Sequence, residues 1–374
     1  MIGVIVMFNM FFIMPCAICL YDVLSMICPL RFSLWAKIPM ALILACGLTR
    51  IFLLRMTPAG FDVYELPRFA GLILSSLFSL MVCALFMLLV KDVIFMLWKV
   101  IIRQPFPSHY ASLFVLVLAV SSTVWGVYQG TRVPDVVEHE VRIKGLAPEF
   151  EGMKAAMLVD IHVGSVNRRE FVQAVVDKVN ALEPDVILIP GDFVDGQVRN
   201  RSGDLEPLSQ LHAPHGVLAV TGNHEYYYDL SGWLKQIESF GIKWLENEHV
   251  LLERGGAHLA IAGVPDPTGG NRDTPKALDG IPGDAPVILM DHQPRFAREN
   301  AKLGVSLQLS GHTHGGQMPG ISQLVARANG GFVRGWYDLD GMKLYNSPGT
   351  SQWDGFIIRL FDPSEITLLI LHGE

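Results

Sequence analysis

The stretch Ser310-Gly311-His312-Thr313-His314-Gly315-Gly316-Gln317 sets two histidines one residue apart in a glycine-rich turn. It directly follows Val305–Leu309, where alternating apolar residues predict a strand. A strand that ends in such a turn can present both imidazoles to one point, which is typical of a metal site. A His-x-His pair also occurs on surfaces by chance, so the interpretation depends on ligands supplied from elsewhere in the chain.

Four earlier predicted strands also end in polar clusters. The strands are 155–159, 185–189, 216–220 and 286–290, and the clusters contain Asp160 and His162, Asp192 and Asp195, Asn223 and His224, and His292. Ligands of open α/β sheets bind at the carboxyl ends of strands, so we expect these side chains to meet. Each cluster alone has an ordinary explanation as a turn or a hydrogen-bonded histidine. Five together indicate one site.

The clusters offer a full set of nitrogen and oxygen ligands for two cations. The candidate metal ligands are Asp160, His162, Asp192, Asn223, His292, His312 and His314. Asp192 follows a glycine, and its two oxygens can bridge two metals. Imidazoles mixed with oxygens, without thiolates, favour two divalent ions of Mn, Fe or Zn. Such a pair activates water for attack on phosphorus, and His224 is the candidate catalytic acid. Asp195 is expected to support the site by hydrogen bonding.

The N-terminal third has the composition of a membrane region. The 374-residue chain has a mean hydropathy of +0.35 and only 17% charged residues. Four runs are long enough to cross a bilayer, which takes roughly 20 residues as helix: 1–21, 38–54, 69–90 and 110–130. A signal peptide could explain only the first. Residues 93–102 are interpreted as an interfacial segment or an extension of the third helix. Arg50 is the only charge in a predicted span, which favours anchoring over transport.

The chain after this region is predicted to be one α/β domain, giving domains 1–130 and 131–374. Helices are expected at 168–182 and 230–240, and a further strand at 258–263. Antiparallel strands with alternating faces are expected at 343–345, 355–361 and 366–371. Two sheet layers covered by helices follow from this pattern. All five cysteines lie before residue 84, and the net charge of −7 argues against nucleic-acid binding.

These motifs together resemble the calcineurin-like metallophosphoesterase family. Asp-x-His, Gly-Asp-x-x-Asp, Gly-Asn-His-Glu, a later His and Gly-His-x-His occur in the family's order. The resemblance implies a four-layer α/β/β/α sandwich, here preceded by about four transmembrane helices. It also implies one metal held by Asp160, His162, Asp192 and His314, and a second held by Asp192, Asn223, His292 and His312, with His224 as the acid-base residue.

Departures from the family pattern bear on the substrate. Asp195 is followed by Gly196-Gln197 instead of the Arg-Gly of the protein phosphatases. The stretch 345–350 resembles a bacterial membrane-associated branch that acts on envelope phospholipids or phosphodiesters outside the cytoplasm. We therefore expect a multi-pass protein of the bacterial plasma membrane, with an extracytoplasmic hydrolase domain acting on lipid-linked or envelope phosphoesters. The alternatives are a tethered phosphoesterase for a soluble nucleotide, an inactive signal-binding domain, and a regulatory domain on a membrane sensor or transporter.

Overall fold

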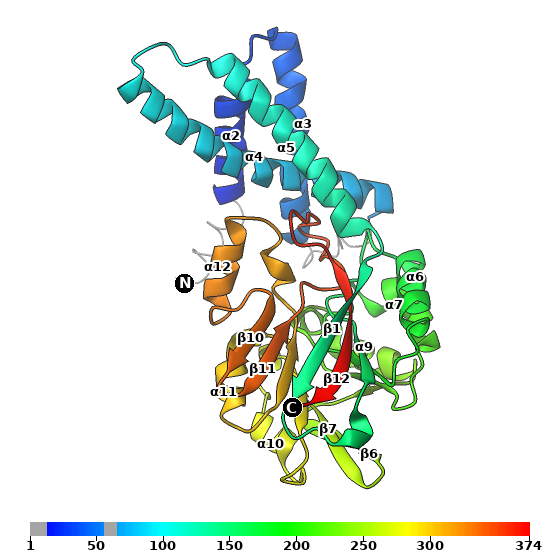
Figure 1. Ribbon diagram of the computed structural model, residues 1–374. Helices are drawn as coiled ribbons and strands as arrows, with labels where there is room; N and C mark the ends of the chain where they lie inside the picture. The colour runs from blue at the N-terminus through cyan, green and yellow to red at the C-terminus, as the bar shows by residue number, and fades with distance from the viewer. Residues whose placement is uncertain (1–12, 56–65) are drawn as a thin grey trace. The chain divides into compact units, whose positions relative to one another are not determined.

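The computed structural model describes residues 13–55 and 66–374 and divides into two compact units. The helical unit comprises the chain up to Gly130 together with Asp354–Leu360, and the α/β unit comprises Thr131–Trp353 and Phe361–Glu374. The chain therefore enters the helical unit a second time, near its C-terminal end. Figure 1 shows both units and labels many of their elements.

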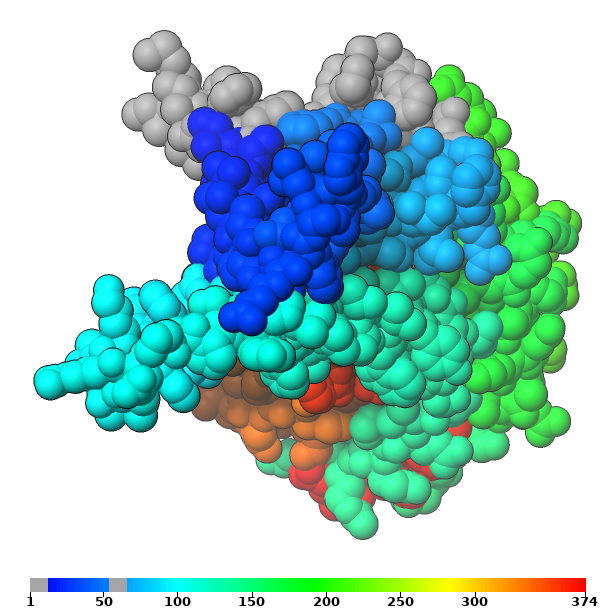
Figure 2. All heavy atoms as spheres, turned by 90° about the horizontal axis from the view of Figure 1, so that it is seen from above, coloured from blue at the N-terminus to red at the C-terminus, as the bar shows by residue number. Residues whose placement is uncertain are grey.

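Within residues 13–55 and 66–130, the helical unit contains three helices that are long and apolar enough to cross a membrane. These are α3 (Leu34–Arg55), α4 (Arg68–Ile101) and α5 (Ser108–Thr131), and they confirm the second, third and fourth predicted spans. Residues 93–102 extend α4. The first predicted span lies partly outside the described residues, and its described part is α2 (Met14–Asp22), continued by the π-helical turn η2 (Val23–Ile27). Figure 2 shows the packed side chains of this unit in blue to cyan.

One buried carboxylate changes the sequence-based view of this unit. Asp22 lies just beyond the first predicted span, yet it is fully buried in the described structure. Its neighbours include Cys19 and Met26, which belong to the apolar cluster shared with α3, α4 and α5. Neither carboxylate oxygen has a hydrogen-bond partner among the described residues. Arg50 is still the only charge within the four predicted spans, but Asp22 adds a buried carboxylate just beyond the first of them. Anchoring as the role of this unit stays a prediction.

The α/β unit contains two six-stranded sheets. The first has the order β1-β12-β2-β3-β4-β5, with β2, β3, β4 and β5 mutually parallel. The bounds are β1 (Asp135–Ile143), β12 (Glu365–Gly373), β2 (Met153–Met157), β3 (Val186–Ile189), β4 (Val217–Ala219) and β5 (Ile242–Trp244). β2 and β3 bury nearly every residue on both faces, as expected for parallel strands covered on both sides.

The second sheet has the order β10-β11-β9-β8-β7-β6, with β7, β8, β9 and β11 mutually parallel. The bounds are β10 (Gly335–Leu339), β11 (Met342–Asn346), β9 (Leu307–Ser310), β8 (Val287–Met290), β7 (Ala257–Gly263) and β6 (Glu248–Arg254). One apolar core, which includes Met157 from the first sheet and Leu309 from the second, lies between the sheets.

Helices cover the outer face of each sheet and complete the predicted four layers. α6 (Arg169–Asn180), α7 (Val198–Leu205) and α9 (Leu230–Glu238) pack on the first sheet, and α10 (Thr274–Leu278) and α11 (Ala297–Ala301) on the second. α6 buries Phe171, Val172, Val175, Val176 and Val179, which lie three to four residues apart on one face. Burying each such side chain contributes about 1.5–3 kcal/mol.

The remaining elements are short. They are η5 (Pro148–Phe150), η6 (Glu206–Gln210), α8 (Asn223–Tyr227), η7 (Pro267–Gly269), η8 (Pro294–Phe296), η9 (His314–Gly316) and α12 (Ile321–Ala328).

The C-terminal tail differs from the sequence-based expectation. The strand predicted at 355–361 is wrong, because this apolar run is irregular and all of it except Phe361 belongs to the helical unit. β11 pairs in parallel with β9, and β12 pairs in parallel with β1, so these strands are only partly antiparallel. β12 is buried on both faces over most of its length instead of alternating. Pairing partners far apart in the chain, which local patterns do not specify, decide both outcomes.

Candidate active site

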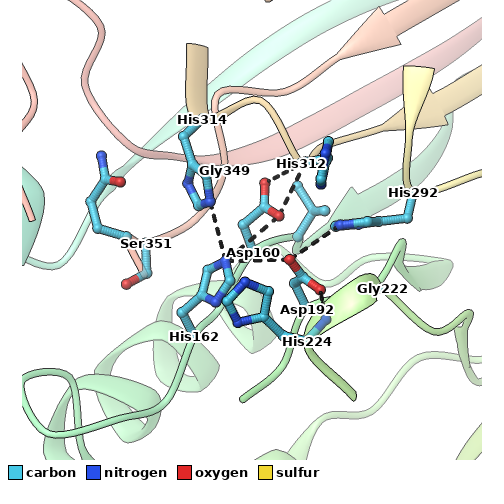
Figure 3. Close-up of polar contacts among 12 residues, drawn as sticks. Asp160, His162, Asp192, Gly222, His224, His292, His312, His314, Gly349 and Ser351 are labelled. Carbon is cyan, nitrogen blue, oxygen red and sulfur yellow. Dashed lines mark hydrogen bonds and ion pairs between the residues drawn. The ribbon is translucent and has the colours of Figure 1, made fainter. Parts of the chain in front are cut away.

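The polar clusters after β2, β3, β4, β8 and β9 meet at one place, where the carboxyl ends of strands from the two sheets face each other (Figure 3). Five of the residues there adopt a left-handed backbone conformation. Their φ values are +54° for Asp160, +44° for His162, +58° for Asp192, +70° for His312 and +49° for His314. This conformation is costly for residues with a side chain and concentrates at functional sites. The loops therefore aim these side chains at the expense of local backbone stability.

The first group of ligand atoms comes from Asp160, His162 and His314, whose candidate atoms all lie within 4.8 Å of one another. All three residues are buried. The Nε2 atoms of His162 and His314 are 3.2 Å apart, and Asp160 Oδ1 lies 3.9 Å from His162 Nε2. Two imidazole nitrogens and a carboxylate oxygen that converge without solvent fit a divalent cation.

The second group consists of Asp192, His292 and His312, also within 4.8 Å. Asp192 stands between the groups, since its Oδ2 lies 3.2 Å from His292 Nε2 and 3.5 Å from His162 Nε2. Asn223 Oδ1 is buried and has no hydrogen-bond partner among the described residues. A buried amide oxygen left unpaired is costly, and a cation would satisfy it.

Buried acceptors orient the histidine rings. Asp195 Oδ1 lies 3.3 Å from His162 Nδ1 and 2.5 Å from His224 Nδ1, as expected for a supporting carboxylate. His292 Nδ1 lies 2.7 Å from the carbonyl oxygen of Pro190. With Nδ1 donating to these oxygens, the Nε2 atoms of His162 and His292 face the centre, where each can bind a cation that replaces its proton. This is the usual support of metal-bound histidine.

The centre contains buried charged groups, and a buried charge requires an opposite charge nearby. Burial raises the pKa of Asp160, and the nearby charge of Asp192 raises it further. Burial also lowers the pKa of His312 to about 3, with the charge of His292 acting in the same direction. His312 is therefore neutral, the form that binds a metal. Burial disfavours the charged form of His292, but the charge of Asp192 outweighs it and raises the pKa of His292 well above its ordinary value. A bound cation would take the place of that proton, and two carboxylates with several imidazoles in a dry site fit divalent cations.

His224 differs from His162 and His292 in its exposure. It is partly exposed, whereas His162 and His292 are fully buried. Burial disfavours its charged form, but the charges of Asp192 and Asp195 outweigh burial and raise the pKa of His224 to about 9. Its backbone amide donates to Asp192 Oδ1 at 2.9 Å. His224 is thus held protonated at the rim of the site.

Two glycines allow the loops to approach this closely. A Cβ at Gly222 would lie 2.1 Å from Asp192 Oδ1, and one at Gly311 would lie 2.6 Å from Asp160 Oδ2. Any side chain at either position would displace a candidate ligand, so both positions require glycine.

Two supporting features escaped the sequence-based reasoning. Glu225 accepts hydrogen bonds from the backbone amides of Asp192, Phe193 and Gly222 and thereby ties two of the loops together. Burial raises its pKa to about 7, and the Asp192 charge adds to this effect. Glu225 was visible in the Gly-Asn-His-Glu motif, but its spacing gave no sign of its backbone partners.

The second feature is residues 347–353, here called the strap. The backbone amide of Thr350 donates to the carbonyl oxygen of Val159 at 2.7 Å, and that of Ser351 donates to the carbonyl of Asp160 at 3.0 Å. Asn167 Nδ2 also donates to Ser351 Oγ, and Gln317 Nε2 donates to Gln352 Oε1 at 2.9 Å. The strap therefore fixes the backbone of a candidate ligand.

Known proteins resemble this chain in sequence. Residues 153–316 match the family described as calcineurin-like phosphoesterase. The chain is 33% identical over 277 residues to a zebrafish (Danio rerio) transmembrane protein with metallophosphoesterase domain, covering 71% of this chain and 63% of that protein. It is 36% identical to a Helicobacter pylori metallophosphoesterase, covering 68% of each chain, and 33% identical to one from Aquifex aeolicus, covering 61% of this chain and 88% of that one.

The fold and site define a metallophosphoesterase domain joined to apolar helices. The chain belongs to the calcineurin-like phosphoesterase family, which confirms the family resemblance found in the sequence motifs. It spans 63% of the length of the zebrafish relative and 62% of a bovine relative of the same description.

Proposed function

We propose that this protein is a membrane-anchored phosphoester hydrolase that uses two divalent metal ions, of Mn, Fe or Zn. One ion would be held by Asp160, His162, Asp192 and His314, and the other by Asp192, Asn223, His292 and His312. The observation that carries this proposal is the position of Asp192, whose Oδ2 faces the Nε2 atoms of His162 and His292 at 3.5 and 3.2 Å. A single carboxylate between two ligand sets is what a dinuclear centre needs.

The protein's own residues supply the remaining chemistry. When bound, the ions would activate water and neutralise charge on the phosphoryl oxygens. His224, charged because Asp195 and Asp192 stabilise its imidazolium, can donate a proton to the leaving oxygen. Asp195 keeps Nδ1 of His224 engaged, so the proton available to substrate is the one on Nε2.

Hydrolysis is tested on the full-length chain in nanodiscs, stripped of metal and reloaded separately with Mn, Fe or Zn. A nitrophenyl phosphodiester and the corresponding monoester distinguish the two bond types. Asp192→Asn should reduce the loaded protein's rate by at least about a hundredfold, since it weakens both ligand sets. Asp204→Asn is the matched control, because Asp204 pairs with Arg201 outside the cluster. Full activity of Asp192→Asn would exclude the proposed centre.

We further propose that the substrate is a lipid-linked or envelope phosphoester. The support is α12, which begins seven residues after His314 and buries none of its residues. Leu324 on this helix is 61% exposed, with Ile321 and Val325 half-buried beside it. Arg327 adds a positive charge. Such a short apolar and basic helix suits the headgroup region of a bilayer.

The lipid proposal is tested by comparing a phospholipid in mixed micelles with the soluble nitrophenyl ester. Leu324→Ser should lower the lipid rate severalfold and leave the soluble rate unchanged. Leu303→Ser is the control, since Leu303 is another exposed leucine outside α12. Equal rates on lipid and soluble esters in the unmodified protein would favour the alternative, a tethered enzyme for a soluble nucleotide.

We place the hydrolase domain on the extracytoplasmic side of a bacterial plasma membrane, as the resemblance to the envelope branch implies. Two separate fusions after Thr131, one to alkaline phosphatase and one to green fluorescent protein, would report the side of the membrane on which the domain lies. Activity of the first fusion supports the placement, and fluorescence of the second contradicts it.

A second candidate function is favoured by Asp22. A fully buried carboxylate without a described hydrogen-bond partner, followed by a π-helical turn, is a feature of functional membrane helices. The helical unit would then sense or transport a small cation under control of the hydrolase. The test measures how hydrolase activity responds to added cations in proteoliposomes. Loss of this response in Asp22→Asn would support the second role, and an unchanged response would leave anchoring as the role of the helices.

A further inference from the structure

Residues 354–360, here called the anchor, form part of the helical unit although the chain on both sides of them belongs to the α/β unit. The anchor has the sequence Asp-Gly-Phe-Ile-Ile-Arg-Leu. Ile357 and Ile358 are fully buried, and Phe356 and Leu360 are less than 9% exposed. The ring of Phe356 packs edge-on against Phe78 of α4 at 6.0 Å.

Polar contacts fix both ends of the anchor. Arg50 of α3 donates from Nε and Nη2 to the carbonyl oxygen of Asp354, at 3.2 and 2.6 Å. Ser75 Oγ of α4 donates to the same oxygen at 2.9 Å. The side chains of Arg50 and Asp354 are fully buried and 3.8 Å apart at their charged ends. At the other end, the amide of Arg359 donates to the carbonyl of Gly126 in α5 at 2.9 Å.

These contacts lie inside the apolar helices, not at their tips. Arg50 precedes the end of α3 by five residues, and Ser75 follows the start of α4 by seven. At a rise of 1.5 Å per residue this corresponds to about 7–10 Å of helix. Irregular backbone is tolerated at such depth only where protein groups satisfy it. Three donors on one carbonyl oxygen meet that requirement.

The anchor is covalently continuous with the strap. Ser351, whose amide binds the carbonyl of Asp160, is three Cα–Cα steps from Asp354. Three steps of 3.8 Å span at most about 11 Å. Displacement of Asp354 therefore pulls on the backbone that fixes a candidate metal ligand.

We propose that the anchor holds the strap in place from within the helical unit and that Arg50 is a positioning residue for the metal centre. Arg50 acts through Asp354 and then through the strap, and it touches neither substrate nor ligands. The proposal deepens the proposed function and rests on it only for the metal-binding readout. It assigns the helices a part in organising the site.

The test measures hydrogen exchange of the strap amides by mass spectrometry on the full-length chain in nanodiscs, without substrate. Arg50→Met should make the Thr350 and Ser351 amides exchange about tenfold faster, because the opening of the strap becomes easier. Arg50→Met/Asp354→Asn should recover part of the protection, since the double change leaves no unpaired buried charge. Lys91→Met is the control, because Lys91 bonds Ser25 elsewhere in the helical unit.

A second variant tests the anchor without removing a charge. A Cβ at Gly126 would lie 2.2 Å from Ile358 Cγ1, so Gly126→Val should displace the anchor and speed strap exchange as Arg50→Met does. Both variants should also need severalfold more Mn for half-maximal binding, measured by calorimetry. The proposal would be overturned if the anchor amides exchange faster in both variants while the exchange of the strap amides is unchanged. An equal effect of Lys91→Met would overturn it too. Neither result depends on whether the protein hydrolyses any substrate.

Discussion

Replacing Asp195 by asparagine removes one charge from the centre while keeping an acceptor oxygen in place. Asp195 Oδ1 contacts the Nδ1 atoms of His162 and His224 at 3.3 and 2.5 Å, and the side chain is fully buried. A hydrogen bond to a charged group contributes about 1.5–3 kcal/mol, and a neutral one about 1 kcal/mol. Two such bonds thus weaken by about 2 kcal/mol in total, which corresponds to roughly thirtyfold at 1.4 kcal/mol per factor of ten.

This loss should appear in two quantities. The Mn concentration for half-maximal activity should rise because His162 is oriented less firmly, and kcat should fall because His224 holds its proton less tightly. The assay is hydrolysis of a nitrophenyl phosphodiester by the full-length protein across a Mn titration. Asp195→Ala should be worse than Asp195→Asn, since it leaves both Nδ1 atoms without an acceptor. A change below threefold in both quantities for Asp195→Asn, or equal rates for the two variants, would refute the role given to Asp195.

Three further outcomes follow from the same geometry. Chelation should lower the thermal midpoint by roughly 5–10 °C, and Mn should restore it; a midpoint insensitive to chelator contradicts a bound metal. Gly311→Ala should reduce Mn affinity at least about tenfold, because its Cβ would lie 2.6 Å from Asp160 Oδ2, whereas Gly203→Ala, which meets nothing within 4 Å, should not. In metal-free protein the pKa of His224 is raised from 6.5 to about 9. This shift contributes about 3 kcal/mol to the free energy of unfolding. The contribution is complete below pH 6.5 and is lost as the pH rises through 9. Thermal midpoints at pH 6 and pH 10 measure it, and His224→Asn should flatten the difference.

The fold class was accessible from the sequence because each strand of the parallel core carries its own local signal. β2, β3 and β8 lie in short apolar runs, and a candidate site residue follows the end of each strand within three residues, so the pattern showed both the strand and the end at which ligands gather. Long apolar runs revealed α3, α4 and α5 in the same way, since spanning a bilayer imposes a length and a composition.

The strands at the sheet edges were harder to recognise. β1 was not predicted, and its register with β12 joins residues more than 200 positions apart, such as Asp135 with Glu365. Residues 355–361 have the composition of a strand, because apolar β-branched residues suit a sheet and the buried interior of a helical unit equally well. Local propensity cannot separate these environments.

The sequence by itself determined which residues were available for the metal centre and at which strand ends they lie, because ligand chemistry and strand periodicity are local properties. Only the tertiary structure decided that Asp192 stands between two ligand groups, that Asp195 serves two histidines, and that Glu225 ties two loops together. It also decided that Asp354 enters the helices to meet Arg50. Each of these facts is a distance between atoms far apart along the chain, and such distances are fixed only when the sheets and helices have packed.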